Sequence, residues 1–109
     1  MPVLNPTTFT ITDTTAQSNG VTGLNINVGT VAGGPYTAHS YPLTAAEVSA
    51  GLPTGTFTGS LASIGEALGP GTYFAVSTAT NASGTSGNSP EVNFQVQTAP
   101  VAPSAFTVS

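Results

Sequence analysis

Apolar and polar residues alternate along much of this chain, which is the pattern of strands that bury one face. The clearest runs are 7–12, 23–28 and 92–96, in which every second residue is apolar. Two further runs, 39–43 and 57–61, share the pattern, and clusters of Gly, Pro, Asn and Ser separate the runs. A period of two between turn clusters predicts strands, so we expect an all-β protein.

The number and spacing of these runs predict a β-sandwich of about seven antiparallel strands. Within each run, the residues of one parity would face the interior between the two sheets. The predicted core therefore contains Phe9, Ile11, Leu24, Ile26, Val28, Tyr41, Leu61, Val92, Phe94 and Val96.

Two short segments have the spacing of a helix start. Thr44 and Glu47 lie three residues apart, as in a capping box, and Gly51 can end the helix after about one and a half turns. Ser63 and Glu66 share this spacing, although Gly65 between them weakens the helix. Helix is therefore expected to be a minor part of the fold.

Residues 68–98 carry a resemblance to a known family of β-sandwich domains. Residues 70–73 read Pro-Gly-Thr-Tyr, an Asn and a Gly follow at 81 and 84, and an alternating strand runs from 92 to Thr98. This order resembles the second half of a fibronectin type III domain, and bacterial Ig-like modules share its Pro-Gly-Thr-Tyr turn. The resemblance implies an Ig-like fold in which 23–28 is strand B, although the tryptophan usual there is missing.

The strand after this turn, 72–80, has two alternative phases. Counting back from the loop places Tyr73, and every second residue up to Ala79, on the inward face. Counting forward from the turn places Phe74 and Val76 there, and this set is the more apolar. Either a bulge changes the phase of the strand, or both faces are covered, one by the other sheet and one by a neighbouring subunit.

The two ends of the chain share a pattern. Residues 6–11 read Pro-Thr-Thr-Phe-Thr-Ile, and residues 103–108 read Pro-Ser-Ala-Phe-Thr-Val. We therefore expect one sandwich module, 1–98, followed by an extension, 99–109, that resembles the first strand of a further module. Chance similarity in a chain rich in Thr, Ser and Ala is the alternative.

The extension is the candidate interaction site. Alternation puts Phe106 and Val108 on one face, which suits strand addition or docking on a flat apolar surface. We predict that Pro103, Phe106 and Val108 pack on a neighbouring copy or on an underlying scaffold. Phe74 and Val76 join the candidate interface if their face of the strand is the one that a neighbour covers.

Charge excludes two classes of partner. The chain has no Lys or Arg and four acidic residues, which gives a formal net charge of −4. Binding to nucleic acid needs a row of cations, and docking on an anionic membrane surface needs them too. The first residues have neither a basic region nor a long apolar run, so we expect no signal peptide and no membrane span.

Candidate chemistry is sparse. His39 is the single imidazole and there is no cysteine, so we expect no metal site and a structural role for this histidine. The four acids show no spacing typical of the paired carboxylates of a glycosidase; they are Asp13, Glu47, Glu66 and Glu91. We predict no catalytic residue, no bound cofactor and no enzymatic activity.

Two features bear on glycans. Asn81 begins an Asn-Ala-Ser sequon, although a turn also favours Asn because it tolerates left-handed backbone. Tyr36, Tyr41 and Tyr73 could stack on sugars, although tyrosines in a β domain are more often core and corner residues. A weak glycan contact is therefore retained as an alternative.

These features predict a non-enzymatic structural protein. The family resemblance implies an appendage domain of the kind found on tailed-phage virions, hence a capsid decoration or cement protein on the virion surface, made in the host cytoplasm. Its expected partners are further copies of itself, the major capsid protein, or both. The alternatives are an extracellular spacer or weak carbohydrate-binding module of a secreted bacterial protein, and a strand-donating filament subunit.

Overall fold

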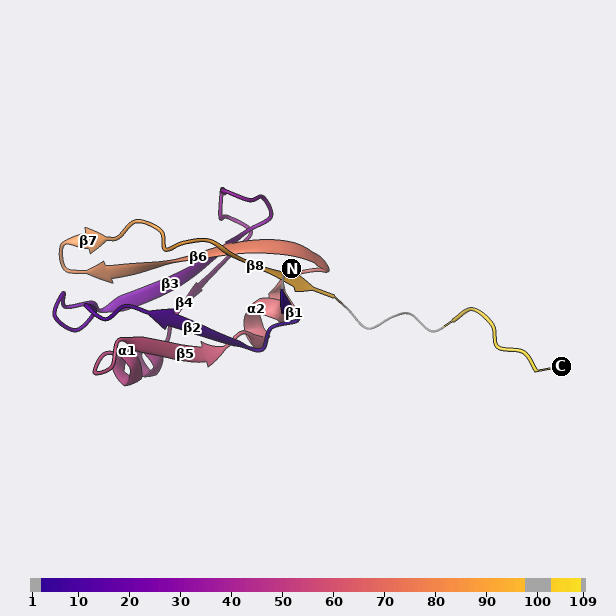
Figure 1. Ribbon diagram of the computed structural model, residues 1–109, viewed down its shortest axis with the longest axis horizontal. Helices are drawn as coiled ribbons and strands as arrows, with labels where there is room; N and C mark the ends of the chain where they lie inside the picture. The colour runs from indigo at the N-terminus through magenta and orange to yellow at the C-terminus, as the bar shows by residue number, and fades with distance from the viewer. Residues whose placement is uncertain (1–2, 98–102, 109) are drawn as a thin grey trace.

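Two β-sheets face each other in the computed structural model, which describes residues 3–97 and 103–108 (Figure 1). The smaller sheet pairs β2 (Thr8–Thr12) with β5 (Thr56–Ser60). The larger sheet contains, in spatial order, β1 (Val3–Leu4), β8 (Val92–Val96), β6 (Gly71–Asn81), β3 (Gly23–Gly29) and β4 (His39–Pro42), and β7 (Gly84–Thr85) pairs with β6. The predicted all-β sandwich is confirmed.

The strand expected to be strand B of an Ig-like fold lies in the other sheet. β3 pairs antiparallel with β6 on one edge and with β4 on the other. In an Ig-like sandwich, strand B lies in the sheet opposite strands F and G, whereas strand C pairs with F. The segment 23–28 therefore has the position of strand C, and its assignment to strand B was wrong.

Among the described strands, neighbours pair antiparallel except β1 and β8, which run parallel. Asn5 ends this pairing: its backbone N–H donates to the Gln95 carbonyl at 2.7 Å. The Asn5 side chain then bonds both backbone groups of Gln97, donating to its carbonyl at 3.1 Å and accepting from its N–H at 2.8 Å. Asn5 has a φ of 47°, a left-handed conformation that Asn tolerates better than most residues. We call this pair the Asn5–Gln97 clamp.

The core forms between the two sheets largely as the alternation predicted. Phe9, Leu24, Ile26, Val28 and Phe94 are buried, whereas Ile11, Tyr41, Leu61 and Val96 are partly buried at its margin. The core also contains residues outside the prediction, namely Ala16, Val21, Leu43, Val48, Phe57, Ile64, Tyr73 and Ala75.

Val92 is the exception among the predicted core residues. Its side chain is 61% exposed, although it shares the parity of the buried Phe94. β8 does turn this face inward, but among the described residues the smaller sheet consists of β2 and β5 alone, and Val92 lines an open cavity beside β2. The prediction that Val92 is a core residue was wrong for this reason.

Both predicted helical segments are helical and close parts of the sandwich, but the predicted start of the second at Ser63 was wrong, because its N-cap is Leu61 and has no side-chain cap. α1 (Ala45–Gly51) begins with the complete capping box, in which Thr44 accepts from the Glu47 N–H and Glu47 accepts from the Thr44 N–H. α1 lies so close to β5 that a Cβ at Gly51 would collide with the ring of Phe57. α2 (Ala62–Ala67) follows β5 directly and places Ile64 in the core with 1% exposure.

Of the two predicted phases of β6, the one that turns Tyr73 and Ala75 inward is observed, and not the more apolar one with Phe74 and Val76. Tyr73 is 8% exposed, stacks on Phe94 with ring centroids 5.8 Å apart, and donates its hydroxyl to the Gly69 carbonyl at 2.6 Å. This bond back to the preceding turn has the geometry described for the tyrosine corner of Ig-like sandwiches. Val76 lies on the opposite face and is 4% exposed within the single chain, so covering it requires no neighbouring subunit.

Candidate binding groove

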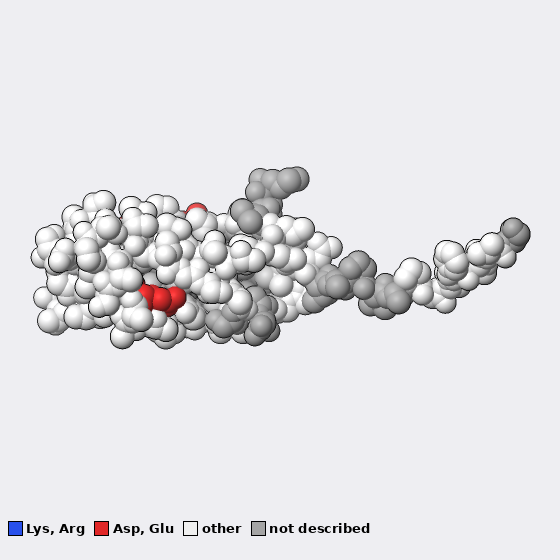
Figure 2. Space-filling model, turned by 90° about the horizontal axis from the view of Figure 1, so that it is seen from below, with Lys and Arg blue, Asp and Glu red and all other residues white. Residues whose placement is uncertain are grey.

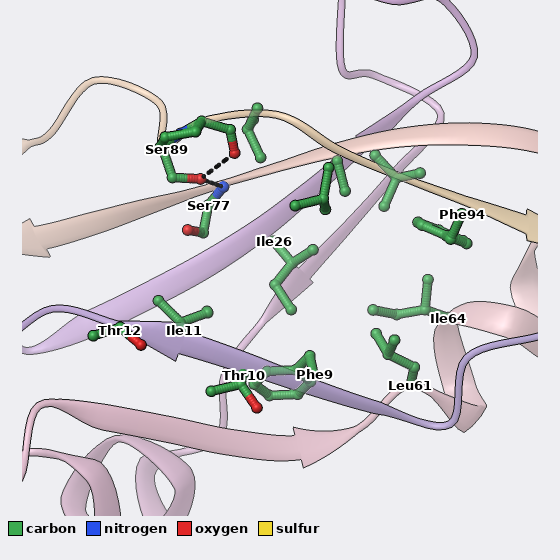
Figure 3. Close-up of a pocket in the computed structure, with 15 residues that line it drawn as sticks. Phe9, Thr10, Ile11, Thr12, Ile26, Leu61, Ile64, Ser77, Ser89 and Phe94 are labelled. Carbon is green, nitrogen blue, oxygen red and sulfur yellow. Dashed lines mark hydrogen bonds between the residues drawn. The ribbon is translucent and has the colours of Figure 1, made fainter. Parts of the chain in front are cut away.

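An apolar cavity opens along one long side of the sandwich, between β2 of the smaller sheet and β8 of the larger one (Figure 3). Its volume is about 290 Å³. Strands β2, β3, β6 and β8 contribute to its walls, together with the start of α2, through residues such as Ile11, Ile26, Leu61, Ile64, Ser77 and Val92. We call this cavity the β2–β8 groove.

The groove exists because the two sheets differ in width. After β1 the chain crosses from the edge of the larger sheet to the smaller one, where β5 is the only described strand that pairs with β2. The larger sheet has five strands in its row and the smaller sheet has two, so the β8 side of the larger sheet lines the cavity next to β2. The inward side chains near the start of β8, including Val92, consequently line an opening.

One wall of the groove is a free strand edge. The Leu61 N–H donates to the Thr7 carbonyl at 2.9 Å, and the Asp13 N–H donates to the Gly55 carbonyl at 2.8 Å. Because bonded and non-bonded pairs alternate in an antiparallel ladder, odd-numbered residues of β2 bond to β5. The backbone groups of Thr8, Thr10 and Thr12 therefore point away from β5, toward the groove.

On the opposite side of the groove, Ser86 and Ser89 fix the segment before β8 on β6 through hydrogen bonds of their backbone and hydroxyl groups. Ser89 donates its N–H to the Ser77 carbonyl at 2.8 Å, and its hydroxyl accepts from the Ser77 N–H at 2.9 Å (Figure 3). Ser86 makes the same two bonds to Ala79, at 2.7 and 2.9 Å. The segment that leads into β8 is thereby fixed on β6, although it is not a regular strand.

Sequence analysis missed this groove. Parity along β8 identifies an inward face, but it does not reveal whether the opposite sheet reaches that far. The serines at 86 and 89 were read as part of a loop, and only their position beside β6 makes their hydroxyls acceptors for a strand. Pro90 was the one local signal, because a proline without an N–H is typical of an edge.

The chemistry of the groove suits an extended peptide segment. Its floor is apolar, and one wall carries a row of backbone donors and acceptors on β2. A free sheet edge next to apolar pockets is the arrangement used for recognition by strand addition, in which main-chain bonds give affinity and alternate side chains fill the pockets.

Three carboxylates accept hydrogen bonds outside the groove: Asp13, from the N–H and hydroxyl of Thr15 at 3.1 and 2.8 Å, and Glu91 and Glu47. Glu91 accepts hydrogen bonds from the Tyr36 hydroxyl at 2.6 Å and the Gly33 N–H at 2.7 Å. These two bonds, from Tyr36 first, lower the pKa of Glu91, while the bond to Glu91 raises the pKa of Tyr36. This network ties the loop after β3 to the start of β8.

The third carboxylate, Glu47, lies on the other long side of the sandwich. It accepts from the Tyr41 hydroxyl at 3.1 Å and from the Thr44 N–H at 2.8 Å. Burial, followed by the bond to Glu47, raises the pKa of Tyr41. With Tyr73 bonded to Gly69, all three tyrosine hydroxyls make hydrogen bonds within the chain.

The remaining chemical candidates lie apart from one another. His39 is half-buried in β4, opposite Val28. Asn81 acts as a turn residue, donating to the Asn19 carbonyl at 2.9 Å and accepting from the Ser83 N–H at 2.8 Å. Within residues 3–97 and 103–108, no three His, Cys, Asp or Glu residues are grouped so that they could hold a metal ion. Neither described helix has the length and hydropathy of a membrane span.

The predicted interface residues fall into two groups. Phe106 is 91% exposed, Val108 is 84% exposed and Pro103 is also exposed, in a segment that extends away from the sandwich (Figure 1). Phe74 is half-buried, whereas Val76 is buried and offers almost no surface to a partner. The predicted boundary between residues 98 and 99, and Ser109 at the end of the extension, lie outside the described residues.

The surface of the sandwich is almost uncharged. Figure 2 shows mostly neutral atoms, with acidic atoms gathered in one small patch and a further spot at the edge. The molecule measures 70 × 27 × 22 Å along its principal axes, and the C-terminal segment accounts for the elongation (Figure 1).

Comparisons of the chain with protein-family models, with curated proteins and with solved structures gave no match. The family resemblance of residues 68–98 therefore stays a prediction from the sequence.

Proposed function

We propose that this protein is a non-enzymatic structural module that joins a larger assembly through residues 103–108, which we call the tail. One observation carries this proposal: Phe106 and Val108, two apolar residues of one parity, are 91% and 84% exposed on a segment outside the sandwich. Exposed apolar side chains of this size favour a partner surface that can bury them.

The energetics of the tail support attachment. Burying a Phe or Val side chain contributes about 1.5–3 kcal/mol each, before the cost of ordering the segment. The Asn5–Gln97 clamp fixes the chain just before the tail, so fewer residues have to be ordered on binding. A moderate affinity per tail, multiplied over the copies of an assembly, gives a stable attachment.

As the specific setting we propose the outer surface of a tailed-phage virion, where the chain would act as a capsid decoration or cement protein. A formal charge of −4 with no Lys or Arg disfavours any location against packaged nucleic acid. A neutral or basic protein surface, either a further copy or the major capsid protein, is the partner that this charge permits.

The attachment is tested with the full chain and the variant Phe106→Ser/Val108→Ser, compared by sedimentation velocity and thermal melting. The full chain should form oligomers, and the variant should be a monomer with an unchanged melting temperature. Val31→Ser is the matched control, because Val31 is 55% exposed on the body of the sandwich and should not affect assembly. Equal assembly by the tail variant would contradict attachment through the tail.

The virion setting has its own tests. Mass spectrometry of purified particles that package a genome encoding this chain should detect it, and particles treated with protease should lose it. Salt-sensitive binding of the purified protein to DNA would contradict the outer-surface location.

A subunit of a filament built by strand donation is the second candidate, and the free edge of β2 is the observation that favours it. The two candidates differ in native mass, because a decoration protein forms a closed oligomer and a filament subunit forms a ladder of sizes. A chain that stays a monomer both by itself and in the presence of the major capsid protein would instead favour a spacer module.

A further inference from the structure

The β2–β8 groove has room for side chains that the chain itself does not supply. A cavity of roughly 150 Å³ lined by apolar residues is large enough to bind benzene. At about 290 Å³, the groove can hold a phenyl ring together with a second, smaller apolar side chain. The free backbone groups of Thr8, Thr10 and Thr12 lie along its wall, so an occupant in extended conformation can bond to them.

The tail repeats the side chains of the strand that borders this groove. Phe9 and Ile11 of β2 point toward the interior, and Thr10 between them points outward and is exposed. Phe106 and Val108 have the same order and spacing around Thr107. A tail laid beside β2 would therefore place both apolar side chains in the groove and Thr107 next to Thr10 on the outer face.

We infer that the β2–β8 groove binds the tail of a second copy of this chain, which adds as a strand to the free edge of β2. The inference rests on the proposed function, since it names the partner and the acceptor site of the tail. It places Phe106 and Val108 over the uncovered inward face of β8, near Val92.

The structure favours a second copy over the chain's own tail. The Asn5–Gln97 clamp holds the chain at the end of β8, and the groove extends back along β8 toward Val92. The chain's own tail would have to reverse direction between Gln97 and Pro103 to enter it. A tail from another copy needs no reversal, and the described tail lies outside its own groove with Phe106 91% exposed.

Such a contact joins two different surfaces. Each chain offers one tail and one groove, so the contact is head-to-tail unless two copies exchange tails. Exchange gives a closed dimer, and successive donation gives a ring or an open filament.

Crosslinking tests the site, because the native chain has no cysteine. The double variant Thr10→Cys/Thr107→Cys, treated with a short thiol-reactive crosslinker, should give covalent dimers and larger species. These should not form when the protein is diluted tenfold, below the assembly concentration, before the crosslinker is added. Thr58→Cys/Thr107→Cys is the matched control, because Thr58 is exposed and lies opposite Thr10 on β5, away from the groove. It should give little crosslinked product.

A second variant tests the strand edge without a crosslink. Thr10→Pro removes an N–H that points toward the groove but that β5 does not use, and proline is tolerated at such edge positions. Losing one main-chain bond should weaken assembly by about 3–10-fold. Thr58→Pro, on the edge of β5 that faces away from β2, should leave assembly unchanged, and thermal melting of both variants reports whether each is folded.

The outcomes separate this inference from the proposed function. Crosslinking within single chains, equal crosslinking at Thr58, or no crosslinking at all would overturn the inference. If Phe106→Ser/Val108→Ser still abolishes assembly in those cases, the tail attaches to another surface and the proposed function stands. If the tail variant assembles normally, both fail.

Discussion

The two long sides of this sandwich are closed in opposite ways. On one side α1 packs against β5, Tyr41 lies edge-on to Phe9 with ring centroids 6.0 Å apart, and Glu47 bonds the Tyr41 hydroxyl. On the other side, no second strand from the described part of the chain pairs with β2, and the β2–β8 groove is open. The comparison teaches that one side is completed by local helix and hydrogen bonding, whereas the other presents a strand edge that a further segment could complete.

The largest expected effect contrasts a buried ring on the closed side with an apolar residue on the open side. Phe57 is fully buried beneath α1, so Phe57→Ala should reduce the free energy of unfolding by about 3–5 kcal/mol. Val92→Ala in the groove should reduce it by less than about 0.5 kcal/mol, because Val92 is 61% exposed. Urea denaturation measures both, and similar losses for the two variants would mean that the open side belongs to the core.

A smaller loss is expected from crowding on the closed side. A Cβ at Gly59 would collide with the Glu47 carboxylate and approach the Phe9 ring to 2.5 Å. Gly59→Ala should therefore cost about 1–3 kcal/mol, as overpacking usually does. Gly69→Ala is the control, because its Cβ would meet no heavy atom within 4 Å. Equal stability of the two variants would show that the closed side is loosely packed.

The pH dependence of the free energy of unfolding measures what the hydrogen bonds of Glu91 contribute to stability on the open side. The pKa of Glu91 is lowered in the folded chain, so its contribution is present above its ordinary value of 4.5 and is lost as the pH falls through the lowered pKa. Glu91→Gln should remove that part of the acid-induced loss in chemical denaturation between about pH 5 and 3. An unchanged pH profile would mean that the bonds from Tyr36 and Gly33 do not stabilise the fold.

Alkaline pH tests the tyrosines in the same way. The pKa of Tyr41 on the closed side is raised, so its contribution is present below 10.0 and is lost as the pH rises through the raised pKa. Tyr41→Phe should flatten the fall in stability above pH 10. Because Tyr36 also has a raised pKa, Tyr36→Phe should flatten the same region, and a double variant resolves the two contributions.

The smallest effect on stability should come from the tail. Deleting residues 103–109 removes a segment whose described residues, 103–108, are all exposed, so the free energy of unfolding should change by less than about 0.5 kcal/mol. The same deletion should abolish assembly. If the shortened chain unfolds instead, the tail completes its own sandwich, and the open side described above is closed in the free protein.

The strands that alternation predicted are those that bury one face under the opposite sheet. Leu24, Ile26 and Val28 illustrate this, because β3 is central in its sheet and each inward residue is covered. The capping box at Thr44 and Glu47 was equally readable, since its bonds span only three residues. The sequence therefore predicted the elements that depend on contacts between residues close in the chain, and the strands whose inward residues are completely buried.

The features that sequence analysis missed depend on residues far apart in the chain. The parallel pairing of β1 with β8 joins residues about ninety positions apart, and β1 is too short to show a pattern. Val76 was an ambiguous signal, because both faces of β6 carry buried residues. The groove forms because the smaller sheet ends at β2. The position of that sheet edge cannot be predicted from Val92 or from the residues next to it in the sequence.

The parallel pairing of β1 and β8 also has a mechanical consequence. A force that pulls on the chain before Val3 and on the tail acts along both strands in opposite directions, so it loads their bonds in shear. The backbone bonds of β1 and the two side-chain bonds of Asn5 to Gln97 would then have to break together rather than one after another. In a protein that is attached to its surroundings at both ends, the resistance to unfolding under force would therefore depend on the short β1–β8 pairing and on the two side-chain bonds of Asn5.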